Sequence, residues 1–165
     1  MDLYVLRHAI AAARDARKFP DDADRPLTDK GIAKLGHVTQ GMQELGLDFD
    51  LVLTSPYVRA RQTAEIVVKA LRLEVRARST RELAPDGDPK VLIADVLSAR
   101  AARPLLVGHE PYLSELISVL LSGDPHLGIA LKKAGLCKLT AETLRFGRCA
   151  SLEWLLSPAH FEKRQ

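Results

Sequence analysis

Near its N-terminus the chain reads Leu3-Tyr4-Val5-Leu6-Arg7-His8, four apolar residues that lead directly into an arginine and a histidine. A short, unbroken apolar run is typical of a strand that is buried on both faces, as in a parallel sheet. Arg7 and His8 would then lie at the carboxyl end of this strand, where open α/β sheets bind their ligands. A guanidinium beside an imidazole at such a place indicates a nucleophile or a base next to an anion site.

The composition is that of an ordinary globular protein. Of the 165 residues, 47% are hydrophobic and 27% are charged, so the chain can bury a full core, and we expect a single domain over residues 1–165. The net charge of +3 is scattered and forms no basic stripe, which argues against a nucleic-acid partner. The sequence shows no apolar run of membrane-spanning length and no signal-peptide pattern. We therefore expect no membrane partner and a cytoplasmic location.

Two cysteines, Cys137 and Cys149, stand twelve residues apart. Neither their spacing nor a flanking histidine indicates a zinc site. We expect both to be small buried residues within strands, with no disulfide between them.

Strand and helix patterns alternate along the chain. Two more apolar runs, Leu51–Thr54 and Leu105–Gly108, predict further central strands. Between the first strand and the first helix, the polar segment Ala9–Arg25 is expected to be a long loop, and long ordered loops tend to be functional. Helical spacing and capping residues predict helices at about 29–45, 57–71, 89–99 and 111–123, with a weak edge strand at 73–79 and strands at about 135–139 and 148–156.

This alternation predicts an α/β fold of three layers, in which helices cover both faces of a mostly parallel sheet. The carboxyl ends of the three apolar strands would then share one edge, which gathers the residues that follow them. Helix N-termini favour anions, the arginine fork suits phosphate oxygens, and histidine supplies a nucleophile or a base. The residues gathered there are Arg7 and His8, Ser55 with Arg59 one turn further on, and Gly108 with His109.

These residues resemble the motifs of the histidine phosphatase superfamily, also called the phosphoglycerate-mutase-like family. The matching positions are Arg7-His8, Ser55-Pro56 with Arg59-Ala60 and Thr63, and Gly108-His109. Two further stretches, Arg25-Pro26-Leu27-Thr28 and Glu82-Leu83-Ala84-Pro85 with Gly87-Asp88, resemble the small SixA-type phosphohistidine phosphatases. The resemblance extends from Leu3 to Pro158 and implies the family's three-layer fold without a large cap insertion.

The resemblance also implies a reaction with a covalent phosphohistidine intermediate. His8 would be the nucleophile, and Arg7, Arg59 and His109 would hold the phosphoryl group. No metal and no cofactor would be needed, because guanidinium and imidazolium groups neutralise the charge. The substrate would be a phosphohistidine-containing protein or a small phosphorylated molecule.

Two positions depart from the family's pattern. Ala9 stands where most members have glycine after the catalytic histidine, which requires a negative φ at Ala9. No inserted region supplies a general acid, and Glu82 is the nearest candidate; a loop carboxylate paired with Arg78 or Arg81 is the other interpretation of this residue. A P–N bond to imidazole breaks easily once the ring is protonated, so a weak acid signal favours phosphohistidine over a phosphate ester.

Three other functions compete with a phosphohistidine phosphatase. One is a phosphatase of small esters or a mutase, although a mutase normally needs a larger cap. The second is a phosphate- or phosphoprotein-binding module without turnover, against which the presence of both His8 and His109 argues, because arginines alone suffice for binding. The third is a nucleic-acid binder, and the only feature in its favour is the isoelectric point near 9.0.

Overall fold

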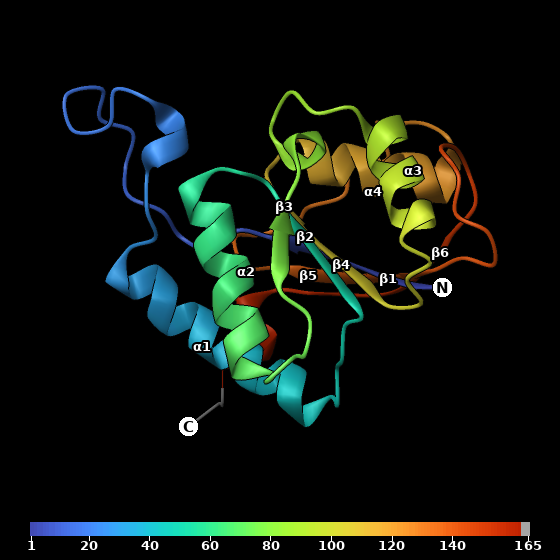
Figure 1. Cartoon of the computed structure of the whole chain (residues 1–165), viewed down its shortest axis with the longest axis horizontal. Helices are drawn as coiled ribbons and strands as arrows, with labels where there is room; N and C mark the ends of the chain where they lie inside the picture. The colour runs from blue at the N-terminus through green and yellow to red at the C-terminus, as the bar shows by residue number, and fades with distance from the viewer. Residues whose placement is uncertain (163–165) are drawn as a thin grey trace.

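The computed structural model describes residues 1–162 and contains one mixed sheet in the strand order β3-β2-β4-β1-β5-β6 (Figure 1). The first four strands of this order are parallel to one another, whereas β5 runs antiparallel to β1 and β6 antiparallel to β5. The mostly parallel sheet is thus confirmed. The strands are β1 (Asp2–Arg7), β2 (Leu51–Thr54), β3 (Ala77–Ser79), β4 (Pro104–Gly108), β5 (Leu136–Thr140) and β6 (Ser151–Leu156).

Helices cover both faces of the sheet. One face packs against α1 and α2, and the other against α3 and α4, which gives the predicted three layers (Figure 1). The helices are α1 (Asp29–Glu44), α2 (Val58–Ala70), α3 (Pro89–Ser98) and α4 (Tyr112–Ser122), and the short 3₁₀ turns are η1 (Asp22–Asp24), η2 (Arg81–Leu83) and η3 (Pro158–His160).

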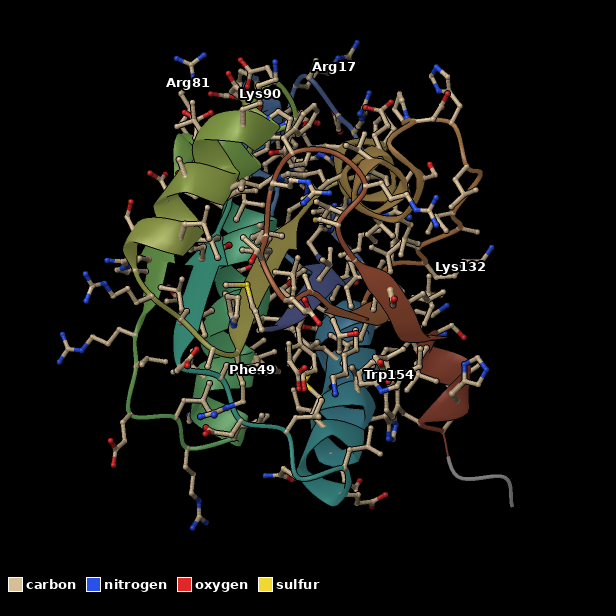
Figure 2. The ribbon with its side chains drawn as sticks, turned by 90° about the vertical axis from the view of Figure 1, so that its right-hand side faces the viewer. Arg17, Phe49, Arg81, Lys90, Lys132 and Trp154 are labelled. Carbon is tan, nitrogen blue, oxygen red and sulfur yellow. The ribbon has the colours of Figure 1, made fainter. Side chains whose placement is uncertain are left out.

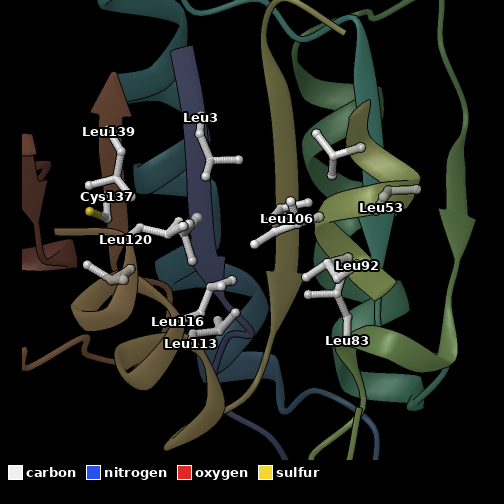
Figure 3. Packing of buried hydrophobic residues seen from close by; sticks show 14 of the residues in the cluster. Leu3, Leu53, Leu83, Leu92, Leu106, Leu113, Leu116, Leu120, Cys137 and Leu139 are labelled. Atoms are coloured by element: carbon white, nitrogen blue, oxygen red, sulfur yellow. The ribbon is translucent and has the colours of Figure 1, made fainter. Parts of the chain in front are cut away.

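The apolar run of β1 is buried on both sides, as its pattern predicts. Leu3 and Val5 point into the core beneath α3 and α4, where Leu3 lies among the leucines of β4 and α4 (Figure 3). Tyr4 and Leu6 point into the core beneath α1 and α2. Tyr4 packs there between Phe49 and Trp154, with ring centroids 5.0 and 6.0 Å away. Burial of one such side chain contributes roughly 1.5–3 kcal/mol to folding.

Local capping fixes the helix that follows the long loop. The hydroxyl of Thr28 accepts a hydrogen bond of 3.0 Å from the backbone N–H of Gly31, which satisfies one of the free donors of the first turn of α1. Gly31 lies so close to the loop after β1 that a Cβ atom would stand 2.1 Å from the carbonyl oxygen of Ile10. Glycine at this position therefore lets α1 pack directly against the segment that follows His8.

Two strands are shorter than predicted. The chain turns at Arg72, whose φ is +53°, so β3 begins only at Ala77 while Leu73 and Val75 pack against the core under α1 and α2. β6 begins at Ser151, which leaves Cys149 outside the strand and only partly buried, against expectation. Both cysteines are free, and burial raises the pKa of Cys137 to about 12. Among residues 1–162, no helix is long and apolar enough to cross a bilayer.

Candidate active site

The register of the sheet brings two histidines together. Arg7 of β1 pairs with Gly108 of β4, and the backbone N–H of His8 extends the ladder with a 3.0 Å hydrogen bond to the carbonyl oxygen of Gly108. His8 and His109 therefore follow neighbouring parallel strands at the same edge. Their ring centroids lie 5.1 Å apart, and both side chains are buried. The prediction that these strand ends meet is confirmed.

The His8 ring is oriented by the backbone of the next residue. Its Nδ1 lies 2.7 Å from the carbonyl oxygen of Ala9, and because a carbonyl only accepts, Nδ1 carries the hydrogen and Nε2 carries the lone pair. Burial, assisted by the charges of Arg59 and Arg7, lowers the pKa of His8 to about 4. His8 is thus neutral at pH 7, and its Nε2 carries an unprotonated lone pair.

Ala9 adopts a negative φ, as the departure from the family pattern requires. Its backbone N–H donates to the hydroxyl of Thr63 at 3.1 Å, and this hydroxyl donates in turn to the carbonyl oxygen of Arg59 at 2.7 Å. The turn after His8 is therefore tied to the first two turns of α2.

Arg59 reaches the histidine from the start of α2. Its Nε lies 3.3 Å from Nε2 of His8, and its guanidinium carbon lies 5.0 Å from the centre of the Tyr57 ring. The side chain is only 4% exposed, so its position is fixed by packing as well as by hydrogen bonds. The predicted proximity of Arg59 to His8 is therefore present in the structure.

His109 is held through its Nε2, which lies 2.7 Å from the hydroxyl oxygen of Ser55. That oxygen also accepts a 3.2 Å hydrogen bond from the backbone N–H of Tyr57, whose ring meets the His109 ring edge-on. Burial, together with the charges of His8 and Arg59, lowers the pKa of His109 to about 3. His109 is therefore neutral in the free protein, and a phosphate dianion bound nearby would raise its pKa.

Two buried nitrogen atoms of the site have no hydrogen-bond partner within residues 1–162. They are Nδ1 of His109 and Nε of Arg7, whose Nη1 donates to the carbonyl oxygen of Leu131 at 3.1 Å. Buried polar groups are nearly always hydrogen-bonded in folded proteins. These two nitrogens are therefore suited to bind the oxygens of an incoming anion.

A cavity of about 550 Å³ opens onto these side chains. Its wall carries five cationic residues and two carboxylates, so it is suited to an anion of higher charge than a carboxylate. Besides His8 and His109, its lining includes Arg7, Arg14, Arg25, Arg59, Lys133, Asp22 and Glu110.

Asp22 links Arg25 to Arg59. It is not among the site residues predicted from the sequence. Nη1 and Nη2 of Arg59 donate to the carbonyl oxygen and to Oδ2 of Asp22, at 2.8 and 3.0 Å. Nε of Arg25 donates to Oδ1 at 2.8 Å. Burial opposes ionisation of Asp22, but these two arginines outweigh it and lower its pKa. The only signal in the sequence was that Asp22 lies in the long loop, just before Arg25.

Glu110 is a second carboxylate on the cavity wall, whereas Glu82 does not line the cavity. Glu110 lines the cavity and accepts hydrogen bonds from the backbone N–H of Ser114, at 3.0 Å, and from the Ser114 hydroxyl. Burial raises the pKa of Glu110. Its place directly after His109 is the feature of the sequence that points to Glu110.

The structure places Glu82, the predicted candidate for a general acid, outside the wall of this cavity. Its Oε2 accepts a 2.6 Å hydrogen bond from the backbone N–H of Asp88, and its side chain does not line the cavity. Nor does it pair with Arg78 or Arg81, since Arg81 pairs with Asp86 at 3.2 Å. Glu82 closes the loop before α3, because the chain turns back there to start the helix.

Within residues 1–162, no group of three or more His, Cys, Asp or Glu side chains is arranged so that it could hold a metal ion.

Comparisons with known proteins agree with this site. Residues 3–83 match the model of the histidine phosphatase superfamily (branch 1). Phosphohistidine phosphatase SixA of Escherichia coli is 30% identical over 127 residues, which are 75% of this chain and 76% of that protein. An uncharacterized protein of Picosynechococcus is 40% identical over 148 residues, 88% of each chain.

Solved structures share the fold. The protein histidine phosphatase SixA complexed with tungstate matches with a TM-score of 0.84 and 26% identity, over 98% of this chain and 100% of that one. A putative α-ribazole-5′-P phosphatase from Escherichia coli matches with a TM-score of 0.74 over 96% and 98% of the two chains, but at 19% identity it shows the fold alone. The chain belongs to the histidine phosphatase superfamily. Family membership and the likeness to SixA support phosphatase activity.

Proposed function

We propose that this phosphatase transfers a phosphoryl group from phosphohistidine in a protein to Nε2 of His8, and from there to water. The observation that carries the proposal is the hydrogen bond between Nδ1 of His8 and the carbonyl oxygen of Ala9, because it directs the lone pair of Nε2 toward the cationic cavity. The sequence similarity to SixA supports phosphohistidine as the substrate class.

In the first step, Nε2 of His8 attacks phosphorus and the P–N bond of the substrate breaks. The substrate imidazole leaves with the electron pair of that bond, as a neutral ring if its other nitrogen is already protonated. The phosphorylated His8 ring then carries a positive charge, which the carbonyl oxygen of Ala9 stabilises through Nδ1–H. In the second step, a water oxygen attacks phosphorus, the P–Nε2 bond breaks, and the spare proton passes to phosphate or solvent.

The charge of the transferred group is balanced by the residues around it. Nε of Arg7 and Nδ1 of His109 supply the donors that lack a protein partner, and Arg59 turns its Nε–H from His8 to a phosphoryl oxygen. His109 gains a proton as the dianion binds, since an adjacent negative charge raises its pKa. Preorganised donors of this kind are usually the largest source of rate enhancement. In this scheme neither a metal nor a cofactor takes part, and a cytoplasmic location remains a prediction.

A second candidate function is the hydrolysis of small phosphate esters. Glu110 favours it, because a carboxylic acid in the cavity, with a pKa raised by burial, would protonate a departing alkoxide. An ester needs this proton more than phosphohistidine does. The two candidates therefore differ in how strongly their rates depend on Glu110.

The proposal is tested by rapid-quench labelling with a ³²P-labelled phosphohistidine peptide. The label on the protein should be lost in acid, kept in alkali, and absent from His8→Ala. A label that is stable in acid, or that persists in His8→Ala, would show that another residue is the nucleophile. The values of kcat/KM for phosphohistidine, phosphoserine and phosphotyrosine peptides and for small esters decide between the two substrate classes; a higher value for the esters would support the second candidate.

A further inference from the structure

A second cavity, of about 360 Å³, adjoins the candidate active site. Pro85 lines both cavities, and Tyr112, on the wall of the second, lies three residues after His109 at the start of α4. Its floor is apolar and includes Leu116 and Val119. Because the two hollows share a wall, a ligand in the first can extend into the second.

Tyr112, which lines this cavity, carries a buried polar atom without a partner among the described residues. Only 7% of the surface of Tyr112 is exposed, and its hydroxyl has no hydrogen-bond partner within residues 1–162. Burial raises the pKa of Tyr112, and the negative charges of Glu82 and Asp88 raise it further. The hydroxyl thus lies in a negative field, where a cation would be favoured.

The rim of the cavity is acidic. Glu115 is exposed there and forms no ion pair with a lysine or arginine in the described part of the chain. Glu82 and Asp88 do not line the cavity, but their charges act on Tyr112, and neither is paired with a lysine or arginine in that part of the chain. Asp86, also on the rim, is paired with Arg81. This negative rim contrasts with the cationic cavity on the other side of Pro85.

Phe146 adds an aromatic wall. Phe146 is 41% exposed, and its ring lies 5.4 Å from the ammonium nitrogen of the exposed Lys90, so the ring face accepts a cation and a partner's cation would displace Lys90 from it. Lys90 projects to solvent at the same end of the molecule as Arg81 (Figure 2). An apolar floor, an aromatic wall and an acidic rim together suit a side chain with a long aliphatic stem and a cationic head.

We propose that this cavity binds a lysine or arginine of the phosphorylated partner protein, within a few residues of its phosphohistidine. The residues that define the cavity are Pro85, Tyr112, Glu115, Leu116, Val119 and Phe146. This inference rests on the proposed function and adds to it a preference for the substrate sequence around the phosphohistidine. We take the occupant to be a polypeptide, because a phosphohistidine and a lysine or arginine on one chain present an anion to one cavity and a cation to its neighbour. An extended chain rises about 3.3 Å per residue, so a few residues bridge a shared wall.

The test compares phosphohistidine peptides that carry lysine or glutamine at each position up to four residues from the phosphohistidine, with free phosphohistidine as the small donor. At one or more positions, the lysine peptide should have a kcat/KM about five-fold or more above its glutamine partner. Glu115→Gln and Phe146→Ala should remove this preference and leave kcat/KM for free phosphohistidine unchanged. Leu152→Ala, which removes an equally exposed side chain from β6, is the matched control and should change neither value.

Equal rates for lysine and glutamine peptides at every position would overturn the inference, as would variants that slow free phosphohistidine and the peptides alike. Binding of a peptide with a non-hydrolysable phosphohistidine analogue, followed by fluorescence anisotropy, separates this result from a failure of the proposed function. If the wild-type protein turns over no phosphohistidine but binds the lysine peptide more tightly than Glu115→Gln does, the docking site stands and the proposed function fails. If neither turnover nor binding depends on the lysine, the docking site fails.

Discussion

Nε of Arg59 donates a 3.3 Å hydrogen bond to Nε2 of His8, the atom that would attack phosphorus. The same guanidinium is fixed at its other end by Asp22, through Nη1 and Nη2. A group that would bind the phosphoryl oxygens therefore holds the nucleophile before the substrate arrives. This arrangement keeps His8 unprotonated, because a hydrogen bond to the lone pair of Nε2 and an adjacent positive charge both oppose protonation.

Arg59→Ala should weaken inhibition by vanadate, because the anion loses a charge-assisted donor. Such a bond is worth about 1.5–3 kcal/mol, which corresponds to an inhibition constant raised by about 10- to 150-fold. Arg61→Ala is the matched control, since Arg61 lies exposed on the same helix. The inhibition constants of vanadate for the two variants, measured at equal ionic strength, test this expectation. Equal constants would place Arg59 outside the anion site.

Asp22→Asn should separate binding from turnover. Loss of a negative charge beside the cationic cluster should strengthen vanadate binding, since the carboxylate no longer competes for Arg25 and Arg59. The amide holds Arg59 less firmly, however, so kcat should fall. Steady-state kinetics and vanadate titration give both numbers. A variant with weaker vanadate binding and unchanged kcat would contradict this role for Asp22.

Glu110→Gln should affect substrates differently according to their leaving groups. If Glu110 protonates an alkoxide, kcat for a phosphate ester with a poor leaving group falls by about 10²-fold or more, whereas phosphohistidine is almost unaffected. The substitution keeps an oxygen that can accept from Ser114, which limits damage to the start of α4. An equal loss on both substrates, with a lower melting temperature, would indicate a structural role alone.

The pH dependence of stability should reflect the two buried imidazoles. In the folded protein the pKa values of His8 and His109 are lowered from 6.5 to about 4 and about 3, so the unfolded chain binds more protons than the folded one below pH 6.5. Stability should therefore decrease as the pH falls from 7 to 5, and it should be restored when the pH rises again. Urea unfolding at pH 7 and pH 5 should show a smaller decrease for His8→Gln. An identical decrease in both proteins would exclude His8 as a source.

Chelation of divalent metals should leave activity intact. Arginine and histidine side chains supply the positive charge around the phosphoryl group in the proposed mechanism. Dialysis against EDTA, followed by an assay with and without added Mg²⁺ or Zn²⁺, checks this. Activity that disappears with EDTA and returns with one of these ions would contradict the mechanism.

The sequence by itself determined which residues end up at the active edge. Unbroken apolar runs specify strands that are buried on both faces, and their alternation with amphipathic helices specifies a parallel sheet. Parallel strands end on one edge, so the sequence alone places His8, His109 and Arg59 together. The main errors at this level were strand boundaries, because the turn at Arg72 and the end of the loop before β6 depend on packing and turn geometry rather than on hydrophobic period.

Only the tertiary structure decided what surrounds those residues. Asp22 belongs to a polar loop with no hydrophobic period, and it meets Arg59, 37 residues away, because the loop folds back over the cavity. Glu82 follows a strand as a general acid would, yet its carboxylate turns to the backbone of Asp88, whereas Glu110 lines the cavity. Periodicity determines which face of an element is buried, but the direction of a polar side chain in a loop depends on the hydrogen-bond partners that the fold brings within reach.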